Sequence, residues 1–115
     1  MIYTNETMNT YSFINKKEIK MKDGTVLPEG KRFQIRWEET ELRHRPRVKA
    51  SGSEYEYKIS NETAIKMLGK KEPSLSSLAR WGDNGNCKSI LGEVVEPDGT
   101  DSYGSPSWLL VKRLI

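Results

Sequence analysis

The chain has 115 residues, of which 30% are charged and 35% hydrophobic, with a formal net charge of +3. This length fits one domain with a modest core, and three Trp, five Tyr and two Phe residues argue against disorder throughout. The single Cys87 excludes an internal disulfide framework, and no apolar run is long enough to span a membrane. We therefore expect a cytoplasmic protein whose basic excess leans towards a polyanion partner.

The N-terminal part of the chain has the pattern of a small antiparallel sheet. Residues 1–10 are polar and without a period, so we expect a loose end there. Phe33, Ile35 and Trp37 alternate strictly with Arg and Gln residues, which is the pattern of a strand with one buried face. We predict a meander over residues 11–37 with one apolar face.

A basic run follows between residues 43 and 49. Its cationic members are Arg43, Arg45, Arg47 and Lys49. The run is either an ordinary solvated loop or a phosphate contact, and its guanidinium density is suited to phosphate or minor-groove binding. Residues 55–59 alternate again and predict a further strand. We assign residues 1–56 to an N-terminal β segment that includes this run.

Two short helices are predicted within residues 57–85. Ser60 or Asn61 can cap the first helix with a side-chain oxygen, and Gly69 stands where a left-handed residue ends it. The apolar stripe of this helix is Ala64, Ile65 and Leu68. A single stripe of this kind indicates a helix with one buried side.

The second helix begins at Pro73-Ser74, because proline can start a helix but cannot continue one. Gly82 and Gly85 end it. Its predicted inward stripe is Leu75, Leu78 and Ala79, and its predicted outward residues are Ser76, Ser77, Arg80, Asp83 and Asn84. Because few residues join the two helices, we expect their stripes to bury each other in a helix-turn-helix.

This pattern resembles the helix-turn-helix of MerR-type and phage excisionase-type winged-helix proteins. The matching positions are Tyr57, Ile59, Ser60, Ala64, Leu68, Gly69, Ser74, Leu78, Arg80, Trp81 and Gly85. The resemblance implies a winged helix-turn-helix over residues 57–115, with a two-stranded wing from residues 89–115 and double-stranded DNA as the partner. It also implies work for a phage or mobile element, as a repressor, an excision or replication-origin factor, or the targeting domain of a nuclease. The wing of that family is commonly basic, whereas this one is not.

The fold class expected from these patterns is α+β: a small antiparallel N-terminal sheet, then a helix-turn-helix, then a C-terminal β-hairpin wing. Residues 96–107 are rich in Pro, Gly and Asp and predict the tip of a long hairpin. The last eight residues are largely apolar. We expect them to pack as a returning strand or a terminal helix, or to form the contact of a homodimer.

The predicted DNA-binding residues follow from this arrangement. Ser74, Ser76, Ser77, Arg80 and Asn84 would lie on the second helix, Lys70, Lys71 and Lys88 would hold phosphates, and Arg43, Arg45, Arg47 and Lys49 would extend the footprint. Short hydroxyls with one Arg allow a helix to lie close in a major groove and still reach base edges. The alternative for Arg80 is a surface salt bridge with Asp83 or Glu72.

No enzyme, metal site or cofactor is predicted. One His and one Cys are thin support for a catalytic dyad, and the Glu-x-Lys and Pro97-Asp98 motifs stand in the wrong order for a restriction nuclease. Glu96, Asp98 and Asp101 do not have the spacing of a calcium loop. The three Trp residues are expected in the core rather than as stacking platforms.

Two other functions stay open. One is a protein-interaction module, for example a small phage inhibitor, that uses the apolar C-terminus and the acidic tip. The other is an RNA-binding domain that uses the aromatic residues of the N-terminal sheet.

Overall fold

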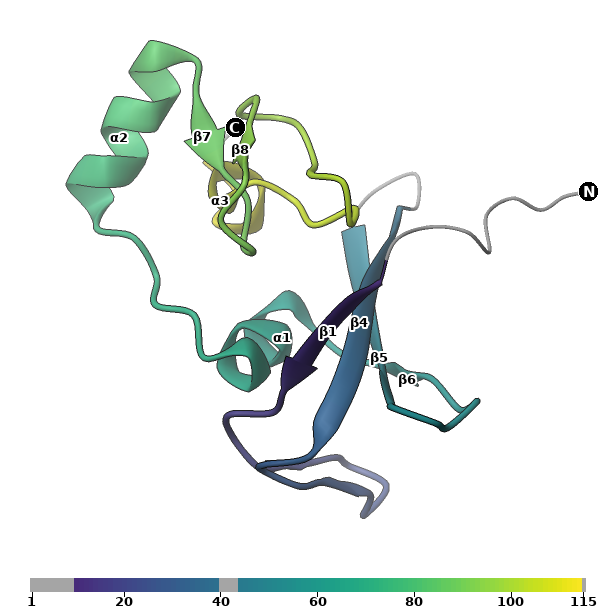
Figure 1. Cartoon of the computed structure of the whole chain (residues 1–115). Helices are drawn as coiled ribbons and strands as arrows, with labels where there is room; N and C mark the ends of the chain where they lie inside the picture. The colour runs from purple at the N-terminus through teal and green to yellow at the C-terminus, as the bar shows by residue number, and fades with distance from the viewer. Residues whose placement is uncertain (1–9, 40–43, 115) are drawn as a thin grey trace, which may run out of the picture.

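The computed structural model describes residues 10–39 and 44–114, and it has the predicted α+β class (Figure 1). A four-stranded antiparallel sheet is followed by short helices and a C-terminal strand pair. The elements are β1 (Tyr11–Ile14), β2 (Ile19–Lys20), β3 (Val26–Leu27), β4 (Arg32–Glu39), β5 (His44–Ala50), β6 (Tyr57–Lys58), α1 (Asn61–Leu68), α2 (Leu75–Asn84), β7 (Cys87–Lys88), β8 (Val94–Val95) and α3 (Trp108–Val111). None of the helices in the described ranges is long and apolar enough to cross a membrane.

The main sheet has the order β1-β4-β5-β6. Its strand β4 buries Phe33, Ile35 and Trp37, each no more than 1% exposed, so the predicted half-buried strand is confirmed. The order of strands differs from the predicted meander, because β1 pairs directly with β4 while β2 and β3 form a hairpin of their own. The buried Asn15 ties this hairpin to the end of β1, because its Nδ2 donates to the carbonyl oxygens of Leu27 (3.1 Å) and Pro28 (2.9 Å).

The basic run is strand β5, so the interpretation as a solvated loop is wrong. This strand lies between β4 and β6, and it buries Pro46 and Val48 on the core face of the sheet. Arg45, Arg47 and Lys49 alternate with these residues and therefore lie on the opposite face. Arg43 lies outside the described residues.

Helix α1 begins and ends where the sequence predicts. The Ser60 side chain accepts a hydrogen bond from the backbone N–H of Thr63, and Gly69 ends the helix with φ +72°. Its buried residues are Ala64, Ile65, Met67 and Leu68, and it packs against β5. Asn61 is not the cap. Its Oδ1 instead accepts from Trp37 Nε1 (2.8 Å), which joins the helix to the sheet.

Helix α2 has the predicted ends but not the predicted packing. Ser74 caps it and Gly85, rather than Gly82, ends it. Of the expected inward stripe only Leu78 is buried, whereas Leu75 is 78% exposed and Ala79 is exposed as well. The segment between the helices carries α2 away from the sheet, so that α2 packs against β7 and α3 while α1 packs on the sheet (Figure 1). The two stripes therefore do not bury each other as expected.

Residues 96–107 are not a protruding tip, and that prediction is wrong. Asp101 is only 9% exposed. Its carboxylate accepts from Ser89 Oγ (2.6 Å) and from the backbone N–H groups of Tyr103 (2.9 Å) and Ser105 (3.0 Å). The Asp101 carboxylate is thus hydrogen-bonded inside the fold, and the segment folds back onto the short β7–β8 pair through the bridge between Ser89 and Ser107.

The C-terminal residues form a terminal helix, which is one of the two predicted packings. Helix α3 buries Trp108 and Leu109. These residues belong to the same hydrophobic cluster as the core side chains of the sheet, α1 and α2. Trp37 and Trp108 are core residues, as predicted, and Trp81 is partly buried and packs against the core cluster. Residues of both predicted segments, 1–56 and 57–115, thus share one core.

Candidate nucleic-acid interface

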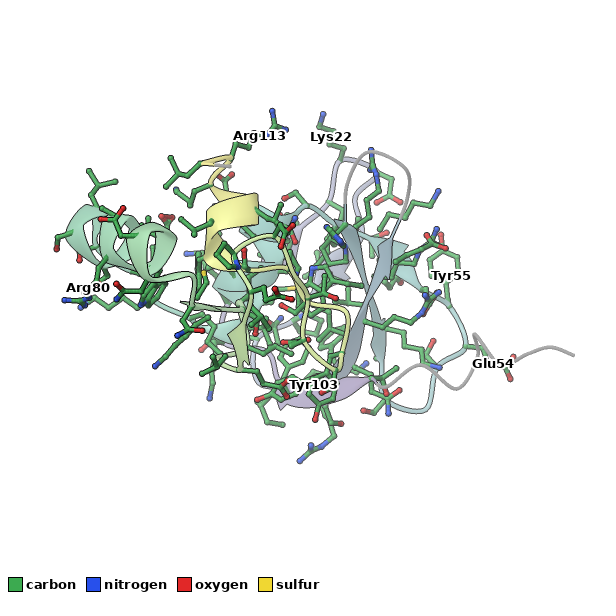
Figure 2. The ribbon with its side chains drawn as sticks, turned by 90° about the horizontal axis from the view of Figure 1, so that it is seen from above. Lys22, Glu54, Tyr55, Arg80, Tyr103 and Arg113 are labelled. Carbon is green, nitrogen blue, oxygen red and sulfur yellow. The ribbon has the colours of Figure 1, made fainter. Side chains whose placement is uncertain are left out.

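The structure divides the predicted DNA-binding residues between two surfaces at opposite ends of the molecule. One group lies on α2 and its flanks, and the other on the main sheet (Figure 1). Figure 2 shows Arg80 of α2 at one end and Tyr55, which precedes β6, at the other, with the sheet and α1 between them. The structure therefore does not bring all of the predicted residues into one footprint.

The outward side of α2 is open to solvent. With 3.6 residues per turn, Ser76, Arg80 and Asp83 lie on the side opposite Leu78, and all three are exposed. Within the part of the chain that the structure describes, Arg80 makes no salt bridge. Of its two predicted alternative partners, Glu72 instead pairs with Lys112 Nζ at 2.9 Å.

The serines at the start of α2 are engaged in its cap. Ser74 Oγ accepts from the backbone N–H of Ser77 (3.2 Å) and donates to Ser77 Oγ (3.1 Å). The Ser76 hydroxyl lies 3.1 Å from the same oxygen. Ser74 thus orders the helix N-terminus. Ser76 is the exposed hydroxyl next to it, since Ser77 is half-buried.

The remaining predicted residues near α2 flank the helix at its two ends. Lys70 and Lys71 lie in the segment before it, Asn84 is its last residue, and Lys88 is exposed on β7. Acidic side chains lie among them: Glu72 precedes the helix and Asp83 is part of it. The positive charge around α2 is therefore modest.

The outer sheet face is much more basic. We use this name for the side of β1, β4, β5 and β6 that points away from the core, together with Glu56. Its charged members are Arg32, Arg36, Glu38, Arg45, Arg47, Lys49, Glu56 and Lys58. Six cations against two carboxylates give an excess of four, which exceeds the net charge of +3 of the whole chain. The basic character of this protein is thus concentrated on one face.

Two ion pairs order part of this face. Arg36 binds Glu56 through two parallel hydrogen bonds, from Nε and Nη2, of 2.8 Å each. Arg47 binds Glu38 Oε1 from Nε (2.9 Å) and Nη2 (2.6 Å). The hydrogen bonds from Arg36 hold the pKa of Glu56 below its ordinary range, and the charges of Arg47 and Lys49 act in the same direction. Glu56 in turn raises the pKa of Arg36.

Sequence reasoning missed half of the cations on this face. Arg32, Arg36 and Lys58 were not predicted as site residues, although the alternation of β4 already opposed Arg36 to the buried Ile35 and Trp37. What the sequence did not show was the register, which sets Arg36 beside Arg47 and Arg47 beside Lys58. Each strand has outward-pointing cations that its own sequence indicates. Only the pairing of the strands shows that these cations lie together on one face.

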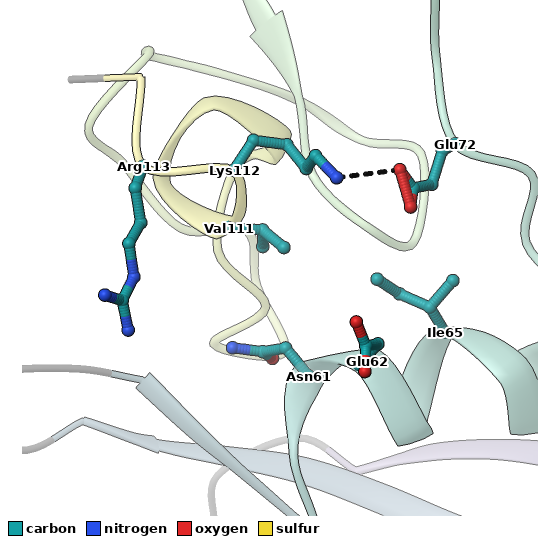
Figure 3. A pocket seen from close by; sticks show the side chains of 7 residues that line it. All are labelled: Asn61, Glu62, Ile65, Glu72, Val111, Lys112 and Arg113. Atoms are coloured by element: carbon teal, nitrogen blue, oxygen red, sulfur yellow. Dashed lines mark hydrogen bonds and ion pairs between the residues drawn. The ribbon is translucent and has the colours of Figure 1, made fainter.

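A pocket lies between the start of α1, the end of α3 and Glu72 (Figure 3). It is lined by Asn61, Glu62, Ile65, Glu72, Val111, Lys112 and Arg113, and the Lys112–Glu72 ion pair crosses one side of it. None of the predicted site residues lines it. In the described ranges, no group of three or more His, Cys, Asp or Glu side chains is arranged to hold a metal ion.

The two surfaces offer different chemistry. An exposed helix face with hydroxyl and guanidinium groups can reach base edges, whereas rows of Arg and Lys on a sheet offer phosphate contacts that do not depend on sequence. No protein family, no curated protein and no solved structure matches this chain.

Proposed function

We propose that this protein is a sequence-specific double-stranded DNA-binding module that places α2 in the major groove. The observation that supports this function is the uncovered side of α2. Of the residues of α2, Leu78 is buried and Ser77 and Trp81 are half-buried, while Ser76 and Arg80 are exposed. The major groove of B-DNA, about 12 Å wide, admits a helix presented in this way.

Each residue near α2 has a role in this proposal. Arg80 reads a base edge, for which the bidentate contact to guanine is the commonest geometry. Lys70, Lys71 and Lys88 hold phosphates on either side, and Ser74 positions the helix through its cap. As the resemblance to phage-type modules suggests, we place the protein in the cytoplasm, serving a phage or mobile element as a repressor, an excision or replication-origin factor, or a nuclease-targeting domain.

Selection of binding sites from a random duplex pool tests this function. We expect an enriched motif, and a palindromic motif would indicate that a dimer binds. Arg80→Ala should weaken binding to that motif by about 1–3 kcal/mol, roughly 5- to 150-fold, because a base contact is lost. It should weaken binding to unrelated duplex much less.

The matched control is Lys22→Ala, which removes one exposed cation from the β2–β3 turn, far from α2 (Figure 2). Its affinity for the motif should stay close to that of the wild type. A pool without an enriched motif, or an equal loss on cognate and unrelated DNA for Arg80→Ala, would contradict base reading by α2.

A second function has one observation in its favour. Leu75, 78% exposed on α2, gives this helix an apolar residue that a protein partner could cover. This candidate is a protein-interaction module, for example a small phage inhibitor. Its binding would be insensitive to salt and lost in Leu75→Ser, whereas duplex binding falls steeply as salt rises.

The RNA-binding alternative needs exposed aromatic residues on the sheet, but Phe13, Phe33 and Trp37 are buried.

A further inference from the structure

We infer that the outer sheet face is a second duplex-binding surface, which holds the phosphate backbone of a DNA segment other than the one at α2. The protein would then bridge two duplexes. This inference rests on the proposed function, because α2 has to hold the first segment. It goes further because it assigns the outer sheet face to a separate DNA segment and not to the segment that α2 binds.

Charge is the first reason. Arg45, Arg47 and Lys49 follow one another on alternate positions of β5, about 6.7 Å apart along the strand, and Arg36 and Lys58 flank Arg47 on the neighbouring strands. Among the described residues, Arg45, Lys49 and Lys58 make no salt bridge, so their charges are available to phosphates. Arg36 and Arg47 lie among these unpaired cations and are held in place by their ion pairs with Glu56 and Glu38.

Position is the second reason. The buried side chains of β4 and β5 face α1 and the core, so the outer sheet face looks away from the helices. The molecule extends 41 × 37 × 22 Å, and α2 lies at the end remote from the sheet (Figures 1 and 2). One duplex would have to bend around the body to meet both surfaces, and bending a 20–30 bp site by 40–90° already costs about 1–6 kcal/mol. Two separate segments avoid this deformation.

The composition of the face selects duplex nucleic acid over other polyanions. Sheets that bind single strands stack bases on exposed aromatic side chains. Here the aromatic residues of the described strands, Tyr11, Phe13, Phe33, Trp37 and Tyr57, alternate onto the core side. A protein partner would need an apolar centre, but among the described outer positions of the strands only Ile14 is apolar. Backbone contact with a duplex needs neither feature.

The test compares two triple variants of the full chain. One removes the unpaired cations of the sheet (Arg45→Ala, Lys49→Ala and Lys58→Ala), and the other removes the same charge from the β2–β3 region (Lys17→Ala, Lys20→Ala and Lys22→Ala). A bead-bound duplex that carries the selected motif is loaded with protein and offered a second, labelled duplex of random sequence. We expect the wild type and the β2–β3 variant to capture the second duplex, and the sheet variant to lose most of this capture.

Salt dependence supplies a second readout. The logarithm of the affinity for random duplex falls with the logarithm of salt concentration by about 0.9 for each phosphate contact, so the sheet variant should lose about 2–3 from this slope. Its affinity for the selected motif at α2 should stay within about twofold. Coincident thermal unfolding curves for both variants would show that each is folded.

The outcomes separate the two proposals. An unchanged slope and full capture in the sheet variant would overturn the second surface while leaving motif binding by α2 intact. Loss of motif binding in the sheet variant as well would mean that a single duplex contacts both surfaces, which also overturns the inference. Equal capture of single-stranded RNA would overturn the assignment to duplex. The absence of any enriched motif would instead contradict the function proposed for α2.

Discussion

Glu56 is the residue whose surroundings describe the outer sheet face best. It accepts two hydrogen bonds from Arg36, and the charges of Arg47 and Lys49 also lower its pKa. A carboxylate among three cations stays ionised to lower pH than usual. Such a group holds the guanidinium of Arg36 in a fixed orientation while the face as a whole stays positive.

The lowered pKa of Glu56 makes a contribution to stability that depends on pH. The ordinary pKa of Glu is about 4.3, and a lowered folded-state pKa stabilises the fold fully above that value. The stabilisation is lost as the pH falls through the folded pKa. We therefore expect Glu56→Gln to lower the free energy of unfolding at pH 7 by roughly 0.5–1 kcal/mol, since the pair is partly exposed.

Urea unfolding of Glu56→Gln and wild type between pH 7 and pH 2.5 measures this effect. The difference between the two proteins should shrink towards zero at the acid end. Glu54→Gln is the matched control, because Glu54 is exposed and forms no salt bridge with another described residue. A difference for Glu56→Gln that stayed constant with pH would contradict the ion pair as its cause.

Single residues also show where sequence reasoning reaches and where it stops. Ser60 and Gly69 were predicted as helix ends because capping depends on residue type and on neighbours a few positions away. Asn61 was considered only as a cap, yet its amide bonds Trp37 and the carbonyl oxygen of His44. Those partners lie 24 and 17 residues away, so no local rule reveals them.

At the scale of elements, strand β5 and helix α2 mark the same limit. Pro46 argues against a central strand, because it cannot donate to a ladder, but its carbonyl oxygen accepts from the backbone N–H of Ile59 (3.2 Å). The stripe of α2 was predicted from its period, but which side is buried depends on what covers it. Here α2 packs against β7 and α3 in such a way that Leu78 is buried and Leu75 is exposed.

Ser74 should matter more to α2 than its neighbours do, because this helix is attached to the body through few side chains. Ser74→Ala removes the acceptor for the backbone N–H of Ser77, which costs about 1 kcal/mol in typical N-caps. We expect faster amide hydrogen exchange in the first turn of α2, with α1 unaffected. Hydrogen exchange followed residue by residue measures both helices together.

The matched change is Ser76→Ala, two residues away from Ser74. Ser76 is exposed, and its hydroxyl only shares the Ser74 oxygen, so exchange in α2 should stay close to that of the wild type. Equal acceleration by both substitutions would mean that serine composition, rather than the cap, orders the helix start.

At the scale of the whole molecule, charge and packing divide the chain differently. The outer sheet face has an excess of four positive charges and the whole chain three, so the rest of the chain has a net charge of −1. Packing crosses that division, because one hydrophobic cluster contains Phe33 of the sheet, Ile65 of α1 and Trp108 of α3. Two surfaces of different charge are thus held by a single core.

This shared core predicts that the chain unfolds as one unit. Trp108 is 4% exposed. The rings of Tyr11 and Tyr103 pack edge to face with their centroids 5.4 Å apart, which also joins the sheet to the C-terminal segment. Trp108→Ala should lower the free energy of unfolding by about 3–5 kcal/mol, because a large buried side chain is removed. Typical domains have only about 5–15 kcal/mol in total, so the sheet should melt at a lower urea concentration together with the C-terminal helices.

Far-UV circular dichroism and the fluorescence of the remaining Trp residues, followed in one urea titration, measure this coupling. Both signals of Trp108→Ala should shift together to one lower midpoint, as a two-state transition requires. Leu114→Ala is the matched control near the same end of the chain: Leu114 is 52% exposed, and its loss should change stability by less than about 0.5 kcal/mol. A circular dichroism signal from the sheet that kept the wild-type midpoint would mean that the sheet and the C-terminal helices fold separately. In that case the distance between the two proposed DNA surfaces would not be fixed, and bridging would depend on the linker after α1 instead of a rigid body.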